Sequence, residues 1–273
     1  MIKPQYKVSF FFIIAFAIFW IGFTLISKIN QRSKEVGDFK YIYKRGIIRV
    51  CGEEDMFSFY KDGQGYHGFH YELAKAFADK YKLKLEYIEE PDFKERIKLL
   101  KSGKCDIISG PLPVIAELRK FVTYTNPILE SKLVLIQRKK DANYNPIRDQ
   151  IALKEKSISV SQNSPNIQRL RNLANEISDS IYIKEHIGYS TKDLMRDVAK
   201  GTVDFAVCDK YIAEAFLKYY PGVDIETPIG FTQFQAWAIK PENKNLLDSL
   251  NHFFAEYKKS PAFERLLQKY SRK

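Results

Sequence analysis

Residues 98–127 read KLLKSGKCDIISGPLPVIAELRKFVTYTNP, and this stretch indicates the fold. It begins as the end of an amphipathic helix, breaks at Gly103, and continues through Asp106 into a short apolar strand. A turn rich in Gly and Pro follows, with Arg119 ahead of a second extended segment. A buried parallel strand that runs into a glycine turn carrying an arginine is a common way to build an anion-binding edge. The stretch therefore predicts an α/β fold, in which Arg119 is either part of an anion-binding edge or an ordinary surface charge.

Strands and helices alternate on both sides of this stretch. The predicted order is strand 47–51, helix 71–81, strand 85–88, helix 93–100, strand 105–109, strand 131–137, strand 157–161, a helix from Ser164 to about 177, strand 181–183, a helix that Thr191 caps and that runs through Ala199, strand 203–207, strand 234–239, helix 246–257 and helix 261–270. Alternation at these lengths favours parallel sheets with right-handed crossovers.

One supersecondary unit occurs twice. The sequences IKLLKSGKCDIISG and LMRDVAKGTVDFAVCD share a helix, a lysine, a glycine, an aspartate and a buried strand. Gly103 corresponds to Gly201, and Asp106 corresponds to Asp204. The repeat predicts two similar α/β lobes.

The composition excludes several classes of function. The 273 residues include 44 Lys and Arg against 33 Asp and Glu, a net charge of +11, which permits an anionic partner. The lysines are interleaved with acids and lack the aromatic pattern of a nucleic-acid groove, so we expect no nucleic-acid partner. His67 and His70 have no third partner, so we predict surface histidines and no metal site. No G-x-S-x-G, P-loop or H-E-x-x-H motif occurs, and no cofactor is predicted.

The N-terminus carries an apolar run. Residues 8–26, VSFFFIIAFAIFWIGFTLI, contain no charge and are long enough to cross a bilayer as a helix. The run exits through LISKINQRSK without a small-residue cleavage pair, which favours an uncleaved anchor over a cleaved signal. We expect the rest of the chain on the periplasmic side of the inner membrane, or free in the periplasm if the segment is cleaved.

Three cysteines, Cys51, Cys105 and Cys208, each fall at the end of an apolar, strand-like run. A buried thiol is the default interpretation at such positions. Cys51 and Cys105 could face each other on neighbouring strands, so one disulfide and no disulfide both stay open.

Three segments in order carry a family resemblance: GFHYELA at 68–74, the helix and Gly–Asp pair at 93–106, and the strand and two helices at 236–270. Together they resemble the extracellular solute-binding proteins of the polar-amino-acid type, which have the periplasmic binding protein type II fold. The resemblance covers about residues 46–270. It implies an α/β fold of two lobes joined by a hinge, behind one N-terminal transmembrane helix.

The resemblance also implies domain boundaries. We expect an anchor or signal at 1–27, a linker at 28–45, the first part of lobe 1 at 46–133, lobe 2 at 134–230, and a return to lobe 1 at 231–273. Residues 71–78, YELAKAFA, are similar in particular to the N-terminal solute-binding module of membrane-bound lytic transglycosylases. The chain ends at Lys273, so we expect this module without the catalytic domain.

The family's ligand residues carry over unevenly. Asp209 matches the aspartate that pairs with the ligand's α-ammonium, and Ser109 and Gly110 match positions that contact ligand. Arg119 matches the arginine that holds the ligand's carboxylate. Ile115 stands in the region where the family has threonine, so ligand contact and ordinary surface charge are both open for Arg119.

The remaining candidates each have an ordinary structural alternative. Asn163 and Ser164 match a turn whose amides meet the carboxylate at a helix N-terminus, although Ser164 could simply cap its own helix. Phe57, or Phe59, and Phe93 could supply apolar walls or belong to the core. Glu53, with Asp55, could meet a cationic group or lie in a solvated turn.

The predicted function is that of a two-lobe clamp. The ligand, an amino acid, short peptide or muropeptide, would shift a hinge equilibrium toward the closed state. Closure would serve either delivery to a membrane permease or sensing linked to cell-wall enzymes. A dehydratase-type enzyme on the same fold is a further alternative, but we expect a protein without catalytic residues.

Overall fold

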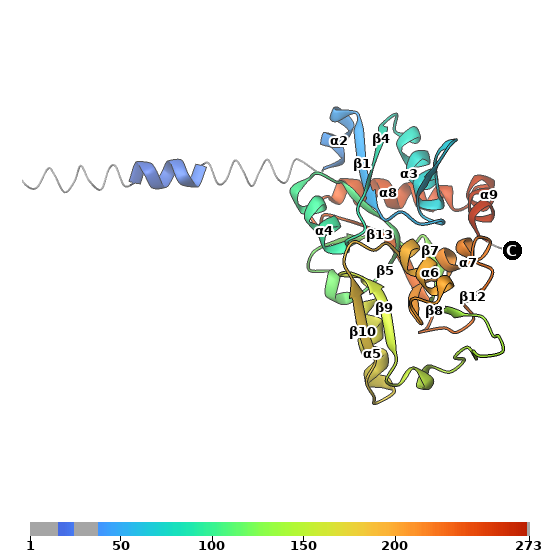
Figure 1. The fold of residues 1–273 in the computed structure, drawn as a ribbon. Coiled ribbons are helices and arrows are strands. Elements are labelled where there is room, and N and C mark those ends of the chain that lie inside the picture. The colour runs from blue at the N-terminus through green and yellow to red at the C-terminus, as the bar shows by residue number, and fades with distance from the viewer. Residues whose placement is uncertain (1–15, 25–37, 272–273) are drawn as a thin grey trace, which may run out of the picture.

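We describe a computed structural model of the chain, and the structure describes residues 16–24 and 38–271. Two lobes are each built on one mixed sheet, and helices cover the sheets (Figure 1). Residues 16–24 form a helix, while the rest of the predicted anchor at 8–26 lies outside the described residues. Within the described ranges, no helix combines the length and the apolar content that a membrane span requires.

The sheet of the first lobe has the order β4-β1-β5-β13-β6, with β7 pairing β13. Strands β1 and β4 are parallel, as are β1 and β5, whereas β13 runs antiparallel to β5, β6 and β7. The strands are β1 (Ile47–Gly52), β4 (Lys84–Glu89), β5 (Ile107–Pro113), β6 (Thr123–Tyr124), β7 (Leu129–Ser131) and β13 (Gln233–Ile239). The helices of this lobe are α2 (Phe39–Arg45), α3 (Phe69–Lys80), α4 (Phe93–Ser102), α8 (Lys244–Tyr257) and α9 (Pro261–Tyr270).

The sheet of the second lobe has the order β10-β9-β11-β8-β12. Its strands are β8 (Leu133–Arg138), β9 (Ser157–Ser161), β10 (Tyr182–His186), β11 (Ala206–Asp209) and β12 (Val223–Asp224). Its helices are α5 (Ile167–Glu176), α6 (Thr191–Lys200) and α7 (Lys210–Leu217). The chain passes between the two sheets at Lys132, between β7 and β8, and again between β12 and β13. Two crossings beside each other leave a cleft between the lobes.

Short elements complete the structure. A hairpin of β2 (Tyr60–Asp62) and β3 (Gly65–His67) turns at residues 62–65, Asp-Gly-Gln-Gly, and two 3-10 turns are η1 (Ala116–Leu118) and η2 (Gln150–Leu153). Helix α2 lies within the range predicted as a linker, because Ile42 is apolar and buried against the core. Helix α7 was not predicted, since it follows β11 without any intervening turn sequence.

Four predicted helix starts are wrong by one to three residues. Helices α3 and α8 each begin two residues earlier than predicted, at Phe69 and Lys244. The other two helices begin beside the cleft. Helix α5 begins at Ile167, not at Ser164, because the Ser164 hydroxyl accepts a hydrogen bond from Asn166 N (3.2 Å) inside a turn. At α6 the cap is Ser190, which forms a capping box with Asp193, so Thr191 is the first helical residue. Both shifts leave the N-terminal turns of these helices pointing toward the cleft.

The repeated unit ends its helices in the same way in both lobes. Gly103 follows α4 with φ 72°, and Gly201 follows α6 with φ 76°. Both φ values lie in the left-handed region that glycine adopts without a Cβ clash. The aspartates differ, because Asp106 is buried and accepts from Arg45 and Arg49 N, whereas Asp204 is exposed and pairs with Arg138.

His70 is a core residue, so its predicted surface position is wrong. Its side chain is fully buried, and its Nδ1 accepts a hydrogen bond from Trp237 Nε1 (2.9 Å). Burial lowers the pKa of His70 to about 3, so the ring is neutral.

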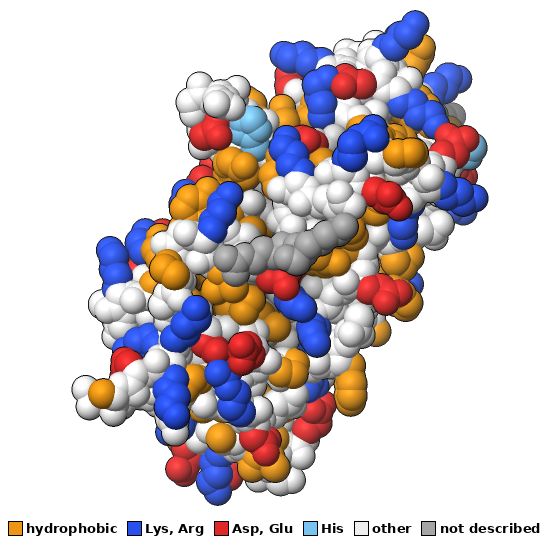
Figure 2. Space-filling view, turned by 90° about the vertical axis from the view of Figure 1, so that its right-hand side faces the viewer, with side chains coloured by type: hydrophobic (Ala, Val, Ile, Leu, Met, Phe, Trp, Pro, Cys, Tyr) orange, Lys and Arg blue, Asp and Glu red, His pale blue; other side chains and the backbone are white. Residues whose placement is uncertain are grey.

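The face shown in Figure 2 carries scattered Lys and Arg with Asp and Glu among them.

Cys51 and Cys105 lie side by side under α4, with their sulfur atoms 2.7 Å apart, and both are free thiols in this structure. Cys208 is buried and its sulfur lies 4.0 Å from that of Met195. A disulfide, which the sequence left open, is therefore a question for Cys51 and Cys105 and not for Cys208.

Candidate ligand-binding cavity

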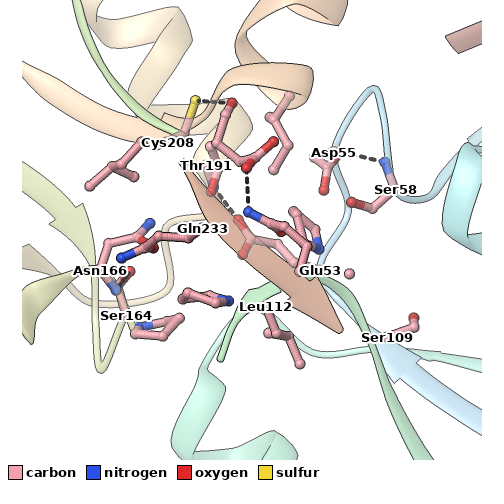
Figure 3. A pocket seen from close by; sticks show the side chains of 18 of the residues that line it. Glu53, Asp55, Ser58, Ser109, Leu112, Ser164, Asn166, Thr191, Cys208 and Gln233 are labelled. Atoms are coloured by element: carbon pink, nitrogen blue, oxygen red, sulfur yellow. Dashed lines mark hydrogen bonds between the residues drawn. The ribbon is translucent and has the colours of Figure 1, made fainter. Parts of the chain in front are cut away.

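A cavity of about 60 Å³ lies between the two lobes and takes residues from both. In Figure 3, Asp55 and Ser58 lie on one side of it, and Ser164 and Asn166 lie on the other. The lining residues are Glu53, Asp55, Ser58, Arg96, Ser109, Gly110, Pro111, Leu112, Pro113, Leu133, Ser164, Pro165, Asn166, Thr191, Cys208, Asp209, Ile212, Gln233 and Gln235. Its volume is well below the ~300–1,000 Å³ of typical drug-sized ligand sites. The cavity therefore suits a small polar molecule.

The first lobe contributes an acidic loop. Asp55 follows β1 and closes a tight turn, where its Oδ1 accepts from Phe57 N (2.7 Å) and Ser58 N (2.6 Å). Burial raises the pKa of Asp55 to about 7 in spite of these hydrogen bonds, and the charge of Glu53 adds to the increase. Asp55 is thus poised between its neutral and charged forms near neutral pH, and a cation in the cavity would favour the charged form.

The second lobe contributes Asp209 at the end of β11. Its Oδ1 caps α7 by accepting from Tyr211 N (2.9 Å), and its Oδ2 accepts from Gln235 Nε2 of β13 (2.6 Å). Burial raises the pKa of Asp209 to about 7, against the lowering effect of these hydrogen bonds. Two carboxyls with raised pKa values in one cavity are typical of a functional site. A cationic ligand would balance the negative charge of these carboxyls when they ionise.

Three buried side-chain atoms in the lining have no hydrogen-bond partner among the described residues: the donor Arg96 Nε, the acceptor Gln235 Oε1 and the hydroxyl Ser58 Oγ. Buried polar groups are nearly always paired in folded proteins, because leaving one unpaired costs about 1–3 kcal/mol. An unpaired donor and an unpaired acceptor in the same cavity suit a ligand that carries both kinds of group.

Contacts across the cleft hold the lobes together in this structure. Thr191 N at the start of α6 donates to Glu53, and Lys192 Nζ pairs with Glu54 Oε1 (2.9 Å). Asn163 Nδ2 donates to Asp92 Oδ2 (2.7 Å). In all three contacts the acid belongs to the first lobe and the donor to the second.

The structure brings five of the predicted site residues to the cavity: Glu53, Ser109, Gly110, Ser164 and Asp209. Ser109 is also fixed from behind by a hydrogen bond between its Oγ and Tyr87 OH (3.0 Å). These residues come from four separate segments: the loop after β1, the middle of β5, the end of β11 and the turn before α5.

Four other predicted residues lie elsewhere. Arg119 follows η1, is exposed, and lies outside the cavity lining. Phe57 is fully buried and stacks on Phe69 (centroids 5.1 Å apart) and Tyr211 (5.0 Å), as the core interpretation expects. Phe93 and Asn163 line a neighbouring groove of about 550 Å³, which shares Ser164 and Pro165 with the cavity.

Arg96 is a lining residue that the sequence reasoning missed. It sits on the buried face of α4 with Phe93, Ile97 and Leu100. A charged residue at helical spacing within an apolar stripe is unusual, and that pattern was visible in the sequence. Gln233 and Gln235 carried no such signal, because glutamine alternating along a strand is typical of a solvated face.

A family model described as bacterial extracellular solute-binding proteins, family 3, matches residues 48–273. The chain belongs to this family. Among solved structures, this solute-binding protein is similar to an ancestral arginine-binding protein bound to arginine, with TM-score 0.72, 28% identity, and 83% of this chain and 98% of that chain covered. It is also similar to the substrate-binding protein of an amino acid ABC transporter, with TM-score 0.70, 26% identity, and 82% and 98% covered. These likenesses confirm the predicted α/β two-lobe fold.

Curated relatives include membrane-bound lytic murein transglycosylase F of Desulfosudis oleivorans, 29% identical over 229 residues, which are 84% of this chain and 49% of the relative. The protein of the same name from Vibrio vulnificus is 26% identical over 284 residues, covering 96% of this chain and 52% of the relative. The chain thus spans about half the length of the curated relatives it matches, and the predicted relationship to this group is confirmed.

Proposed function

We propose that this solute-binding protein closes its two lobes on a small amino-acid-like ligand. The observation that carries the proposal is the interlobe cavity, in which a buried donor (Arg96 Nε) and a buried acceptor (Gln235 Oε1) have no partner among the described residues. An amino acid supplies a carboxylate for the donor and an ammonium for the acceptor. The similar solved proteins include one bound to arginine and one bound to glutamine.

The charges of the cavity favour a ligand with cationic character. The lining contains three acids, Glu53, Asp55 and Asp209, and one arginine, Arg96. A cation beside Asp55 or Asp209 would ionise a carboxyl whose pKa burial has raised to about 7.

A thermal-shift screen of the purified protein against the twenty standard amino acids tests this proposal. We expect stabilisation by a few of them, with basic and amide side chains foremost, and loss of the shift in Asp209→Asn. Asparagine retains the helix-capping oxygen of Asp209, so this variant removes the charge without removing the cap. No stabilisation by any amino acid would contradict the proposal.

A second candidate is a regulatory module that binds muropeptide-type cell-wall ligands. The groove of about 550 Å³ beside the cavity favours it, because a peptide held by its end in the cavity could continue there. The lytic murein transglycosylase relatives point the same way. Adding purified muropeptides to the same screen separates the candidates: a larger shift with muropeptides than with any free amino acid favours the second, and a permease that copurifies with the protein favours transport.

We further propose that residues 8–26 anchor the protein to the inner membrane, with the lobes in the periplasm. The uncharged length of this run supports the proposal. Carbonate extraction of membranes and the mass of the mature protein test it. An intact N-terminus in the membrane pellet is expected, whereas a shortened chain in the periplasmic fraction would indicate cleavage.

A further inference from the structure

Arg96 is a buried cation whose surroundings leave it incompletely paired. It lies in the first turn of α4, its side chain is 5% exposed, and it lines the interlobe cavity. Arginine is always charged, and charged side chains are rarely this buried unless they are paired. The groups around Arg96 therefore decide whether it is a structural ion or a ligand contact.

The contacts of Arg96 use few of its five N–H donors. Its Nη2 donates to Pro91 O over a long 3.4 Å and lies 3.7 Å from Glu53 Oε2. The guanidinium also lies over the Phe93 ring, 5.2 Å from its centroid. Its Nε has no partner within the described chain. A guanidinium built for a structural role would have its donors satisfied.

Glu53 is a partial partner, because its carboxylate is shared. Its Oε1 accepts from Thr191 N at the N-terminus of α6, on the opposite lobe. Its Oε2 stays beyond hydrogen-bond distance of Arg96. Glu53 thus balances part of the positive charge of Arg96. The Nε–H group of Arg96 stays available as a donor to another anion.

In this structure Arg119 does not contribute its positive charge to the cavity. It is exposed on the turn after η1 and lies outside the lining. The segment that carries it follows β5, whose last three residues include Pro111 and Pro113, and their rings restrict the backbone there. Arg96 and Asp209, by contrast, line the same small cavity.

We propose that Arg96, and not Arg119, binds the carboxylate of the ligand. The assignment rests on the proposed function, since it concerns which residue holds one group of the amino-acid ligand. The carboxylate accepts from Arg96 Nε, and the ammonium of the same ligand lies toward Asp209. Arg119 then belongs to the outer surface of the protein.

Binding measurements on the full chain in detergent test the assignment. The test ligand is the standard amino acid that binds tightest, together with its α-carboxamide, which lacks the anionic group. We expect wild type to bind the acid about 100-fold more tightly than the amide, because a buried charge pair is lost with the amide. Arg96→Gln should weaken binding of the acid by a similar factor and bind acid and amide about equally. Arg119→Gln should stay within about twofold of wild type for both.

The outcomes separate the two proposals. Equal binding of acid and amide by wild type overturns the Arg96 assignment, and this result does not depend on any variant folding. A large loss in Arg119→Gln with a small loss in Arg96→Gln also overturns it, while the proposed function stands. If wild type binds no amino acid, the proposed function fails, and the assignment fails with it.

Arg96→Lys serves as the control for a merely structural role. It keeps the charge beside Glu53 but has no donor at the Nε position. We expect near wild-type thermal stability with a loss of affinity for the acid. Wild-type affinity in Arg96→Lys would show that Nε does not contact the ligand, which overturns the assignment.

Discussion

At the scale of single residues, the two cavity carboxyls lead us to expect that affinity for the proposed ligand depends on pH. Asp55 and Asp209 each have a pKa of about 7, raised by burial, so near neutrality each is about half protonated. An ammonium beside Asp209 lowers its pKa in the complex, so binding releases a proton. Affinity is then weakest below pH 7 and reaches its plateau above pH 7.

We predict that affinity for the ligand rises about tenfold between pH 6 and pH 8, the change that one carboxyl of pKa 7 produces. Isothermal titration in buffers of different ionisation enthalpy measures both the affinity and the released proton. In Asp209→Asn the profile should flatten. A wild-type profile that is flat, or that falls with pH, would contradict the role of Asp209.

The same residues affect folding with the opposite sign. A carboxyl whose pKa is raised in the folded state binds more protons there than in the unfolded chain, so its contribution to stability falls as pH rises from about 4 to 7. His70 acts against this, because its folded pKa of about 3 is below the usual value of 6.5. The pH dependence of unfolding should therefore be read as the difference between wild type and Asp209→Asn, which isolates one carboxyl.

Cys51 and Cys105 yield a prediction about oxidation. Both are buried on neighbouring segments of the first lobe, with their sulfur atoms in contact. In protein purified from the periplasm, we predict a disulfide between them, so that titration in denaturant finds Cys208 as the remaining thiol. Cys105→Ala should then free the thiol of Cys51. Three titratable thiols in wild type would show that the pair stays reduced.

At the scale of elements, the sequence specified helix ends better than helix starts. A glycine after an amphipathic helix is a local signal, and Gly103 and Gly201 end α4 and α6 as the repeat indicated. Helix starts depend on which of several polar residues caps, so Ser164 and Thr191 were misassigned while Asn166 and Ser190 took those places.

A substitution at Gly103 tests whether the left-handed backbone at the end of α4 contributes to stability. Gly103→Ala puts a Cβ on a residue at φ 72°, which we expect to destabilise the protein by about 1 kcal/mol and to lower Tm by about 2–4 °C. Gly63→Ala is the matched control, because it lies in an exposed turn where an added Cβ meets no atom within 4 Å. An equal effect of both changes on Tm would contradict a special role for the backbone at Gly103.

The candidate site was only partly predictable, for a physical reason. Residues on buried strands, such as Asp209 at the end of β11 and Ser109 within β5, are placed by the topology of the sheets, which the sequence pattern indicates. The same pattern does not indicate the direction of a side chain in the loop after a strand. Arg119 lies in such a loop, directly after η1. Gln235 reaches the cavity because β13 crosses back to the first lobe, which no local pattern reveals.

At the scale of the whole molecule, three contacts favour the closed arrangement: Glu53 with Thr191 N, Glu54 with Lys192, and Asp92 with Asn163. Two of these use side chains alone and can be removed without changing the cavity lining. The closed state should therefore be populated before ligand binds, with the ligand adding to an existing bias.

We predict that a double variant, Asn163→Gly with Lys192→Ala, is more open without ligand and binds ligand about 3- to 10-fold more weakly, because part of the binding energy then goes into closure. Glycine suits the positive φ of Asn163 (56°), and the change leaves Asp92 in place as the N-cap of α4, the helix that carries Arg96. Energy transfer between dyes on the two lobes measures the opening. Lys75→Ala with Lys154→Ala is the control, since it removes two surface ion pairs within single lobes. Unchanged transfer in the double variant would mean that these contacts do not set the equilibrium.

The hydrogen bond between Trp237 and His70 has a spectroscopic consequence. The chain has two tryptophans, so Trp20→Phe leaves Trp237 as the sole emitter, fully buried on the strand that also carries Gln235. Its indole should emit at short wavelength. Since His70 remains neutral at every pH above about 3, the imidazole does not change its quenching across the physiological range. Fluorescence of this one buried side chain can thus follow unfolding, which exposes the indole, through the whole pH series without an added label.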